Sequence, residues 1–142
     1  MIYWYGPVTD PRDRKHCYEV RNEVFVKGQS ISAPAESDGN DYLCHHFLGM
    51  LDEQVIAAAR IFPEGLTAKV QRVAVLPQWQ KTGAGRRLMT AVITFAAAEG
   101  YQQLLLGAQF DVIGFYAKLG FKLIGEEYQE VGIRHQNMRL TL

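Results

Sequence analysis

The stretch with the clearest chemical potential is 70–89, which reads as a strand, a stop, a polar loop with two glycines and the start of a helix. The first N–H groups of a helix have no intrahelical partner, and the helix dipole makes that end positive. Such a junction suits a phosphate or pyrophosphate, and Lys81, Arg86 and Arg87 add positive charge. The alternative is an ordinary connection that uses glycine only for turn geometry.

Two common phosphate-binding motifs do not fit the loop 80–85. A P-loop closes with Gly-Lys-Ser/Thr, whereas Arg86 and Arg87 follow Gly85 here. A Rossmann fingerprint needs a third glycine three residues after the second, and Leu88 stands there. What remains is a tight loop whose amides point outward at a helix N-terminus.

The strand before this loop, 67–75, carries an irregularity. Val70 alternates with polar neighbours, but Val73 and Val75 continue the apolar series out of phase by one position. A β-bulge near residues 71–73 would produce this slip and splay the strand from its neighbour. The alternative is that both faces of a central strand are buried.

The elements that must position these residues favour an α/β fold with a mixed sheet. The predicted strands 46–51, 55–62 and 67–75 are separated by tight turns and form an antiparallel meander. The next predicted helix, 84–99, leads to the short apolar run 103–108. A run of this kind reads as a buried strand parallel to 67–75, reached by a βαβ crossover.

The flanking segments complete one predicted domain over residues 1–142. Residues 1–5 are expected to form an edge strand, and Asp10-Pro11 starts a helix that runs to near Phe25. The segment 26–40 is expected to be a mobile surface loop or a broken helix. The C-terminal part is predicted to hold a short helix at 111–119 and strands at 121–126 and 137–142, the strands joined by a polar segment that contains His135.

Composition excludes several classes of protein. The formal net charge is zero, with 15 basic and 15 acidic residues, which gives no overall electrostatic footprint for nucleic acid. No apolar run approaches the roughly 20 residues of a membrane span, and no signal peptide is visible. Cys17 and Cys44 fit neither a disulfide framework nor a metal spacing, which indicates reduced thiols in a cytoplasmic protein. No other spacing predicts a metal site.

Two motifs resemble those of the Gcn5-related N-acetyltransferase (GNAT) family. The strand end Val73-Ala74-Val75 and the loop 80–85, QKTGAG, resemble its motif A, in which Gln/Arg-x-x-Gly-x-Gly/Ala follows a strand. Residues 115–121, FYAKLGF, resemble its motif B, an aromatic pair before a Lys-Leu-Gly-Phe turn. One helix and one strand separate the two motifs, which fits the family.

The resemblance extends over nearly the whole chain. Residues 21–26 and the acidic stretch 36–39 are similar to the small bacterial ElaA-like and YjcF-like branch. Residues 130–138 are similar to that branch and to the glyphosate N-acetyltransferases.

The resemblance implies that acetyl-CoA lies in a V between the strands that end at Val75 and Ala108. Its pantetheine arm would pair with the strand backbone, the Val75 N–H would polarise the thioester carbonyl, and loop amides would hold the pyrophosphate. Gln109 stands where many members carry asparagine. The implied cofactor-binding residues are Val73, Ala74, Val75, Gln80, Lys81, Thr82, Gly83, Ala84, Gly85, Arg86, Gln109, Phe115 and Tyr116.

The same resemblance suggests two catalytic residues. Acetyl transfer needs a neutral amine and a proton for the departing thiolate. Tyr116 matches the tyrosine that many members place beside the sulfur, and a phenol can donate that proton; packing in the core is its alternative role. His135 is the candidate base, since histidines titrate near neutral pH and the glyphosate N-acetyltransferases use one in a matching Val-Gly-x-x-His context. A lone histidine is otherwise more often structural.

Substrate selection is expected to fall to the loop after the first helix and the segment before His135. Arg21 matches a position where glyphosate-acting relatives use an arginine, but the rest of their arginine set is not evident, so glyphosate-like substrates do not follow. Two interpretations of the charged residues in these segments stay open: they contact the substrate, or they only face solvent. The candidates are Glu36, Asp38 and Asp41 for a cationic amine, and Arg21, Arg72 and Arg134, with His135, for the rest of the substrate.

The expected function is therefore transfer of the acetyl group of acetyl-CoA to a primary amine of a small molecule by direct attack. One alternative is the same fold acting on a protein N-terminus or a lysine side chain, which would need an open groove. The other is an acyl-CoA-binding sensor without turnover. We expect no metal, nucleic-acid or membrane partner, and a homodimer stays open because dimers are common in the family.

Overall fold

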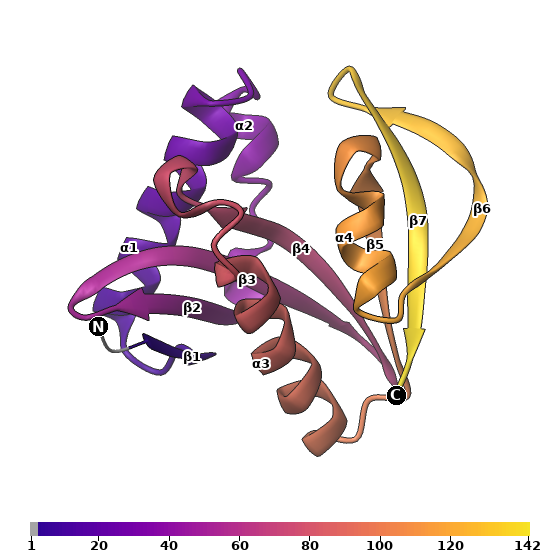
Figure 1. Ribbon diagram of the computed structural model, residues 1–142, viewed down its shortest axis with the longest axis horizontal. Coiled ribbons are helices and arrows are strands. Elements are labelled where there is room, and N and C mark those ends of the chain that lie inside the picture. Colours follow the sequence, from indigo (N-terminus) through magenta and orange to yellow (C-terminus); the bar gives the residue numbers. More distant parts are fainter. Residues whose placement is uncertain (1–2) are drawn as a thin grey trace.

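Seven strands form one mixed sheet in the computed structural model, which describes residues 3–142 (Figure 1). Their order across the sheet is β1-β2-β3-β4-β5-β7-β6, and every neighbouring pair is antiparallel except β4 and β5. The predicted meander and βαβ crossover are confirmed. The strands are β1 Tyr3–Pro7, β2 His45–Leu51, β3 Gln54–Glu64, β4 Thr67–Val75, β5 Gln103–Gln109, β6 Lys122–Glu130 and β7 Ile133–Thr141.

Four α-helices accompany the sheet in the described residues: α1 Pro11–Arg21, α2 Ala33–Glu36, α3 Ala84–Ala98 and α4 Ile113–Lys118. As predicted, the Asp10 side chain accepts a hydrogen bond from the Arg12 N–H at the start of α1. A π-helical stretch, Asn22–Lys27, continues α1. Short 3₁₀ turns lie at Asp41–Leu43, Pro77–Trp79 and Phe110–Val112. No helix within residues 3–142 is long and apolar enough to cross a membrane.

The two faces of the sheet are covered by different helices (Figure 1). Alternation along β2 places Phe47 in the hydrophobic cluster that contains α3, and Leu48 in the cluster that contains α1. Leu88 and Val92, on the predicted apolar face of α3, are both 0% exposed. The sheet therefore separates two hydrophobic cores, one on each face.

The predicted bulge lies in β4. Pairing with β3 shifts register between Ala58 and Arg60, and Arg72 adopts a left-handed backbone conformation with φ of 56°. Val70 packs in the α3 cluster, and Val73 and Val75 pack against that same cluster. The extra residue explains how apolar positions of odd spacing share one face. The alternative also holds at Ala74, which is 1% exposed and packs in the α1 cluster, so β4 carries a bulge and is covered on both faces there.

Three expectations differ from the structure or lie outside it. The strand predicted over residues 1–5 is β1, but residues 1–2 lie outside the described part of the chain. The segment 26–40 carries α2, as the alternative of a broken helix predicted, but it does not lie wholly on the surface, because Glu36 is only 6% exposed. The polar segment predicted between the last strands is itself mostly strand, with only residues 131–132 as the turn. β6 has no buried face, so its sequence lacks the alternation that marks a strand.

The core position of α3 gives a direct stability prediction. Leu88→Ala should lower the free energy of unfolding by about 2–5 kcal/mol, because it removes buried methyl groups and leaves a cavity. Leu66→Ala is the matched control: Leu66 is 58% exposed, and its truncation should change stability by less than about 0.5 kcal/mol. Urea unfolding of both variants checks this, and equal losses would contradict the packing described.

Candidate active site

The site is an opening between β4 and β5. These parallel strands pair only from Thr67–Gln103 to Val70–Leu106, and they diverge beyond that point (Figure 1). The Leu76 N–H donates to the Ile56 carbonyl of β3 at 2.9 Å. Since successive residues of a strand point their backbone groups to opposite sides, the N–H and C=O of Val75 face away from β3, toward the opening.

The loop after β4 offers free donors next to this edge. α3 begins at Ala84, and its first intrahelical bond is from the Arg87 N–H to the Gly83 carbonyl at 3.1 Å. The N–H groups of residues 84–86 therefore have no intrahelical acceptor, and no side chain caps this end. Lys81 and Gly83 have positive φ, of 61° and 92°, which makes the turn tight. Such a helix start binds phosphate well.

Side chains of the loop fasten it to the strand. The Gln80 Nε2 donates to the Val75 carbonyl at 3.0 Å, and the Thr82 hydroxyl donates to the Trp79 carbonyl. Gln80 and Thr82 were both predicted to bind the cofactor, and the structure gives them this bracing contact. Ala84 is buried at 1% exposure, so only its backbone is available to a ligand.

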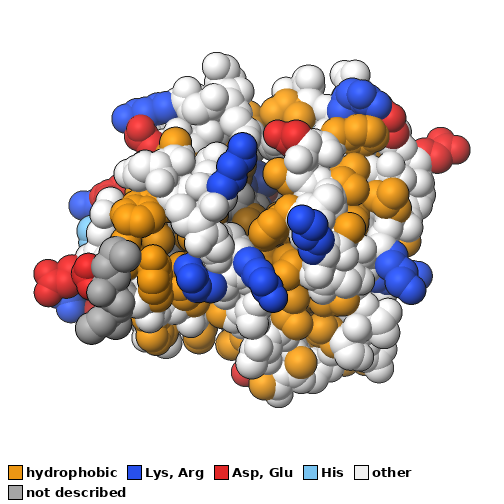
Figure 2. Space-filling model, in the orientation of Figure 1, with side chains coloured by type: hydrophobic (Ala, Val, Ile, Leu, Met, Phe, Trp, Pro, Cys, Tyr) orange, Lys and Arg blue, Asp and Glu red, His pale blue; other side chains and the backbone are white. Residues whose placement is uncertain are grey.

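A depression of about 360 Å³ lies at the start of α3, lined by Gly83, Arg86, Arg87 and Thr90. The Arg87 guanidinium also stacks 4.4 Å from the Tyr3 ring centroid, which holds it beside the loop. On one face of the molecule, Figure 2 shows a hollow with Lys and Arg side chains around it and hydrophobic side chains near it. This surface suits a ligand with several phosphates and an apolar part.

The two sequence motifs meet at Gly85. A Cβ on Gly85 would lie 3.2 Å from Cζ of Phe115 and 3.7 Å from a methyl group of Val75, so the missing side chain lets α4 approach the loop. Phe115 thereby lies next to the predicted cofactor loop. This close approach explains why a glycine stands at position 85, the second glycine of the motif.

Tyr116 is the more buried of the aromatic pair, at 7% exposure. Its ring packs edge-on against Phe115 and Phe121, with centroids 5.0 and 5.7 Å away. Burial raises the pKa of Tyr116, which keeps its phenol protonated at neutral pH. Both roles considered from the sequence, core packing and proton donation, remain compatible with this place.

His135 lies in β7, where it pairs with Gln109 of β5 and Tyr128 of β6. It is 6% exposed, and its ring stacks on Tyr128 with centroids 5.6 Å apart. Its Nδ1 lies 2.7 Å from the Ile133 carbonyl. A carbonyl only accepts, so Nδ1 carries the proton and Nε2 keeps the lone pair that a base requires.

A side-chain bridge spans the opening near His135. The Gln109 Nε2 donates to the Gln29 Oε1 at 2.9 Å, which joins the end of β5 to the loop that follows the π-helical stretch. Arg134 pairs with Glu127 across the β6–β7 hairpin and lies 4.1 Å from the Phe110 ring centroid. The structure thus gathers His135, Gln109 and Gln29 in one region.

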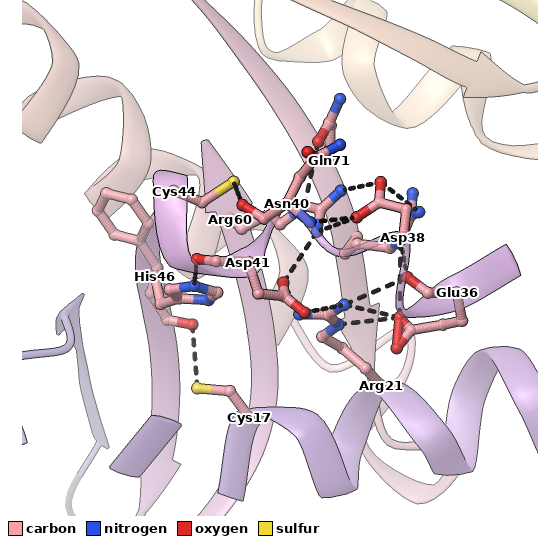
Figure 3. A network of polar contacts seen from close by, with 12 residues as sticks. Cys17, Arg21, Glu36, Asp38, Asn40, Asp41, Cys44, His46, Arg60 and Gln71 are labelled. Atoms are coloured by element: carbon pink, nitrogen blue, oxygen red, sulfur yellow. Dashed lines mark hydrogen bonds and ion pairs between the residues drawn. The ribbon is translucent and has the colours of Figure 1, made fainter. Parts of the chain in front are cut away.

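The charged substrate candidates form a network of their own (Figure 3). Arg21 donates to Glu36 and Asp41, both at 2.7 Å, and Arg60 pairs with Asp38 at 2.7 Å and Asp41 at 2.8 Å. Arg21 and Arg60 are 1% and 0% exposed. Both arginines are therefore buried ion-pair partners. Their carboxylate partners Glu36, Asp38 and Asp41 do not simply face solvent.

The roles of Arg21 and Arg72 as substrate contacts stay predictions, and the network limits what each side chain can reach. The Arg21 guanidinium is engaged by two carboxylates and shielded from solvent. The Arg72 side chain is 23% exposed and bonds the backbone of α2. Arg60, which sequence reasoning did not select, is central to the network. The sequence does offer a signal for Arg60, since it is a charged residue that follows three alanines within a predicted strand.

Comparison with known proteins identifies the class that this fold and site define. A family model described as an acetyltransferase (GNAT) domain matches residues 15–142. The chain belongs to the GNAT acetyltransferase family. The N-acetyltransferase YjcF of Bacillus subtilis, a relative of otherwise uncharacterised function, is 32% identical, with 87% of this chain and 89% of YjcF covered.

Solved structures share the fold. A protein from Lactobacillus plantarum superposes with a TM-score of 0.93 at 24% identity, over 100% of this chain and 99% of that one. Escherichia coli ElaA gives a TM-score of 0.87 at 24% identity, over 97% and 99%. A GNAT family acetyltransferase from Elizabethkingia anophelis, solved with acetyl-CoA bound, gives 0.73 at 19% identity, over 99% and 98%. The predicted GNAT fold and the relationship to YjcF are confirmed, and ElaA shares the fold, whereas nothing in these matches supports the link to glyphosate N-acetyltransferases.

The network predicts a specific loss of stability in acid. Hydrogen bonds from Arg60 hold the pKa of Asp38 below its usual range. For Asp41, burial acts to raise the pKa, but hydrogen bonds from Arg21 and Arg60 outweigh it. A carboxyl whose pKa is lowered by folding stabilises the fold above its unfolded value, about 3.9, and that contribution is lost as the pH falls through the folded value.

Asp38→Asn should therefore lower the free energy of unfolding at pH 7 by about 1–3 kcal/mol. Below about pH 4, the free energy of unfolding of this variant should fall less steeply with pH than that of the wild type. Glu64→Gln, which removes the exposed pair with Lys69, is the control and should change little. Thermal unfolding from pH 7 to 3 measures both effects. Parallel pH curves for Asp38→Asn and wild type would contradict the prediction.

Proposed function

We propose that this protein transfers the acetyl group of acetyl-CoA to a primary amine of a small molecule. The observation that carries the proposal is the unpaired edge of β4 after Val70, next to the free N–H groups at residues 84–86. An extended pantetheine arm fits such an edge as an added strand, and a pyrophosphate fits such a helix start. Family membership and the acetyl-CoA bound to the Elizabethkingia anophelis relative support the same donor.

Acetyl-CoA would supply an acetyl group already activated as a thioester. The Val75 N–H, directed into the opening, would stabilise negative charge that develops on the carbonyl oxygen. The Tyr116 hydroxyl would donate to the departing sulfur. Because a phenol with a raised pKa is a weaker acid than a thiol of ordinary pKa, near 8.5, Tyr116 would contribute first as a hydrogen-bond donor and give up its proton only to a thiolate made basic by burial.

His135 would take the proton that the amine loses when it attacks the thioester carbon. Its hydrogen bond to the Ile133 carbonyl fixes the tautomer and leaves Nε2 as the acceptor. His135 pairs with Gln109 in the sheet and so lies at the end of β5, on the far side of the opening from β4, which supports this role. The acceptor would bind there, next to Gln109 and Gln29.

The Gln29–Gln109 bridge favours a small acceptor over a peptide, because a chain laid across the opening would have to displace it. A panel of small amines and peptides, assayed by release of the CoA thiol, tests the proposal. We expect turnover with small amines. Turnover with peptides alone would favour a protein N-acetyltransferase, and acetyl-CoA binding without any turnover would favour a sensor.

Tyr116→Phe removes only the hydroxyl and should lower kcat by about 10²-fold or more, with little change in acetyl-CoA affinity. Tyr101→Phe, which alters a half-buried tyrosine ahead of β5, is the matched control and should keep wild-type turnover. Steady-state kinetics and calorimetry measure the two quantities. Wild-type turnover in Tyr116→Phe would remove the acid role.

His135→Ala should lower kcat by about 10²-fold, because the proton acceptor proposed at the end of β5 would be missing. His45→Ala is the control, since His45 is exposed at the start of β2 and packs on Phe95. Steady-state kinetics of both variants provide the test. Wild-type turnover in His135→Ala would assign the base to another residue.

A further inference from the structure

We propose that the ion network around Arg72 is a positioning device for the acetyl donor, which fixes the β4 bulge so that the backbone groups of Val73 and Val75 face the opening. The inference rests on the proposed function, because it assigns residues that set the geometry of the donor site. Arg72, Arg60 and Asp38 are the positioning residues. None of them needs to touch acetyl-CoA to act.

The bulge needs an external restraint. Arg72 has φ of 56°, a left-handed conformation that a residue with a long side chain seldom adopts. Such a conformation persists when the surroundings over-determine it. The ladder with β3 does not supply the restraint, because pairing jumps from Ala58–Ala74 to Arg60–Gln71 and leaves Arg72 and Val73 without a partner.

The Arg72 side chain supplies that restraint. Its Nε donates to the Glu36 carbonyl at 3.0 Å, and its Nη2 donates to the Ala35 carbonyl at 3.2 Å and to Asp38 at 3.3 Å. The two carbonyls lie at the C-terminal end of α2, where the last carbonyls of a helix have no intrahelical donor. The bulge and α2 therefore hold each other in place.

The network also holds the residue before the bulge. The Arg60 Nε donates to the Gln71 Oε1 at 3.0 Å, while its two terminal nitrogens bond Asp38 and Asp41. Arg60 stands at the register shift of β3, opposite the bulge. Asp38 consequently joins the guanidinium groups of Arg60 and Arg72. One carboxylate is thereby tied to Arg72 in the bulge and, through Arg60, to Gln71 before it; Figure 3 shows Asp38, Arg60 and Gln71.

Burial makes this arrangement stiff. Arg60 and Arg21 are at most 1% exposed, and Glu36 is 6% exposed. A buried charge that loses its partner cannot easily recover the solvation it gave up, so the pairs resist rearrangement. The arginines of the network are as many as its carboxylates, so no uncompensated charge is left to bind an acetyl acceptor. The members are Arg21, Arg60 and Arg72 with Glu36, Asp38 and Asp41. The arrangement suits a fixed brace better than a substrate pocket.

Two substitutions at one position test the proposal. Arg72→Ala removes the clamp and keeps the strained backbone, whereas Arg72→Gly removes the clamp and tolerates the positive φ. Acetyl-CoA affinity is measured by calorimetry without an acceptor, so that any effect on amine binding is excluded. If the side chain positions the donor site, both variants should bind acetyl-CoA about tenfold more weakly.

Asp38→Asn tests the same contact from its other side and should also weaken acetyl-CoA binding. Combined with Arg72→Ala, the two losses should be less than additive, because both changes break the Arg72–Asp38 pair. Glu64→Gln is the matched control: it removes an ion pair with Lys69 between β3 and β4 at the end far from the bulge, and it should leave the affinity unchanged. Arg72 is partly exposed, so its variants are expected to fold, and thermal unfolding verifies this.

The proposal is overturned if Arg72→Ala binds acetyl-CoA as the wild type does. Recovery of wild-type affinity in Arg72→Gly alone would also overturn it, since backbone strain and not the side-chain clamp would then explain the loss. A raised KM for the amine with unchanged acetyl-CoA affinity would make Arg72 an acceptor-binding residue instead. Failure of the wild-type protein to bind acetyl-CoA would overturn the proposed function itself, which distinguishes the two failures.

Discussion

The structure depends on one constraint: two parallel strands, β4 and β5, that share a ladder over only four residue pairs and then separate. The bulge at Arg72 turns β4 away from β5 at that point. Beyond the bulge, β4 still pairs with β3 but no longer has β5 as a neighbour. Unpaired strand backbone is costly inside a protein unless something pairs with it. The edge of β4 that faces away from β3, the glycine loop and the start of α3 together form a surface that suits an extended ligand with phosphates.

Charge on this protein is divided between two tasks. Arg86 and Arg87 stay exposed beside the N-terminus of α3, where they can meet phosphates. Arg21 and Arg60 are buried and neutralised by carboxylates from the segment around α2. The zero net charge of the whole chain conceals this separation, which explains why composition excluded a general polyanion partner but said nothing about a local phosphate site.

Local patterns were enough to predict most of the fold. The slip in apolar phase before Val75 predicted the bulge, and the glycine loop with the aromatic motif at 115–121 predicted the family. The extent of β6 and β7 could not be predicted, since β6 is exposed on both faces and carries no alternation. The place of Arg21 was also hidden, because its partners Glu36 and Asp41 lie 15 and 20 residues away and meet it only through tertiary packing. Spacing alone cannot tell a buried ion pair from a substrate contact.

The central claim is that the donor pairs with the free edge of β4 and with the start of α3. Amide hydrogen exchange, followed residue by residue with and without saturating acetyl-CoA, tests it most directly. The account predicts slower exchange at the Val75 N–H and at residues 84–86, whose N–H groups lack partners in the free protein, and no comparable change in β1 or β6. Unchanged exchange at those four positions, with protection appearing elsewhere, would contradict the account.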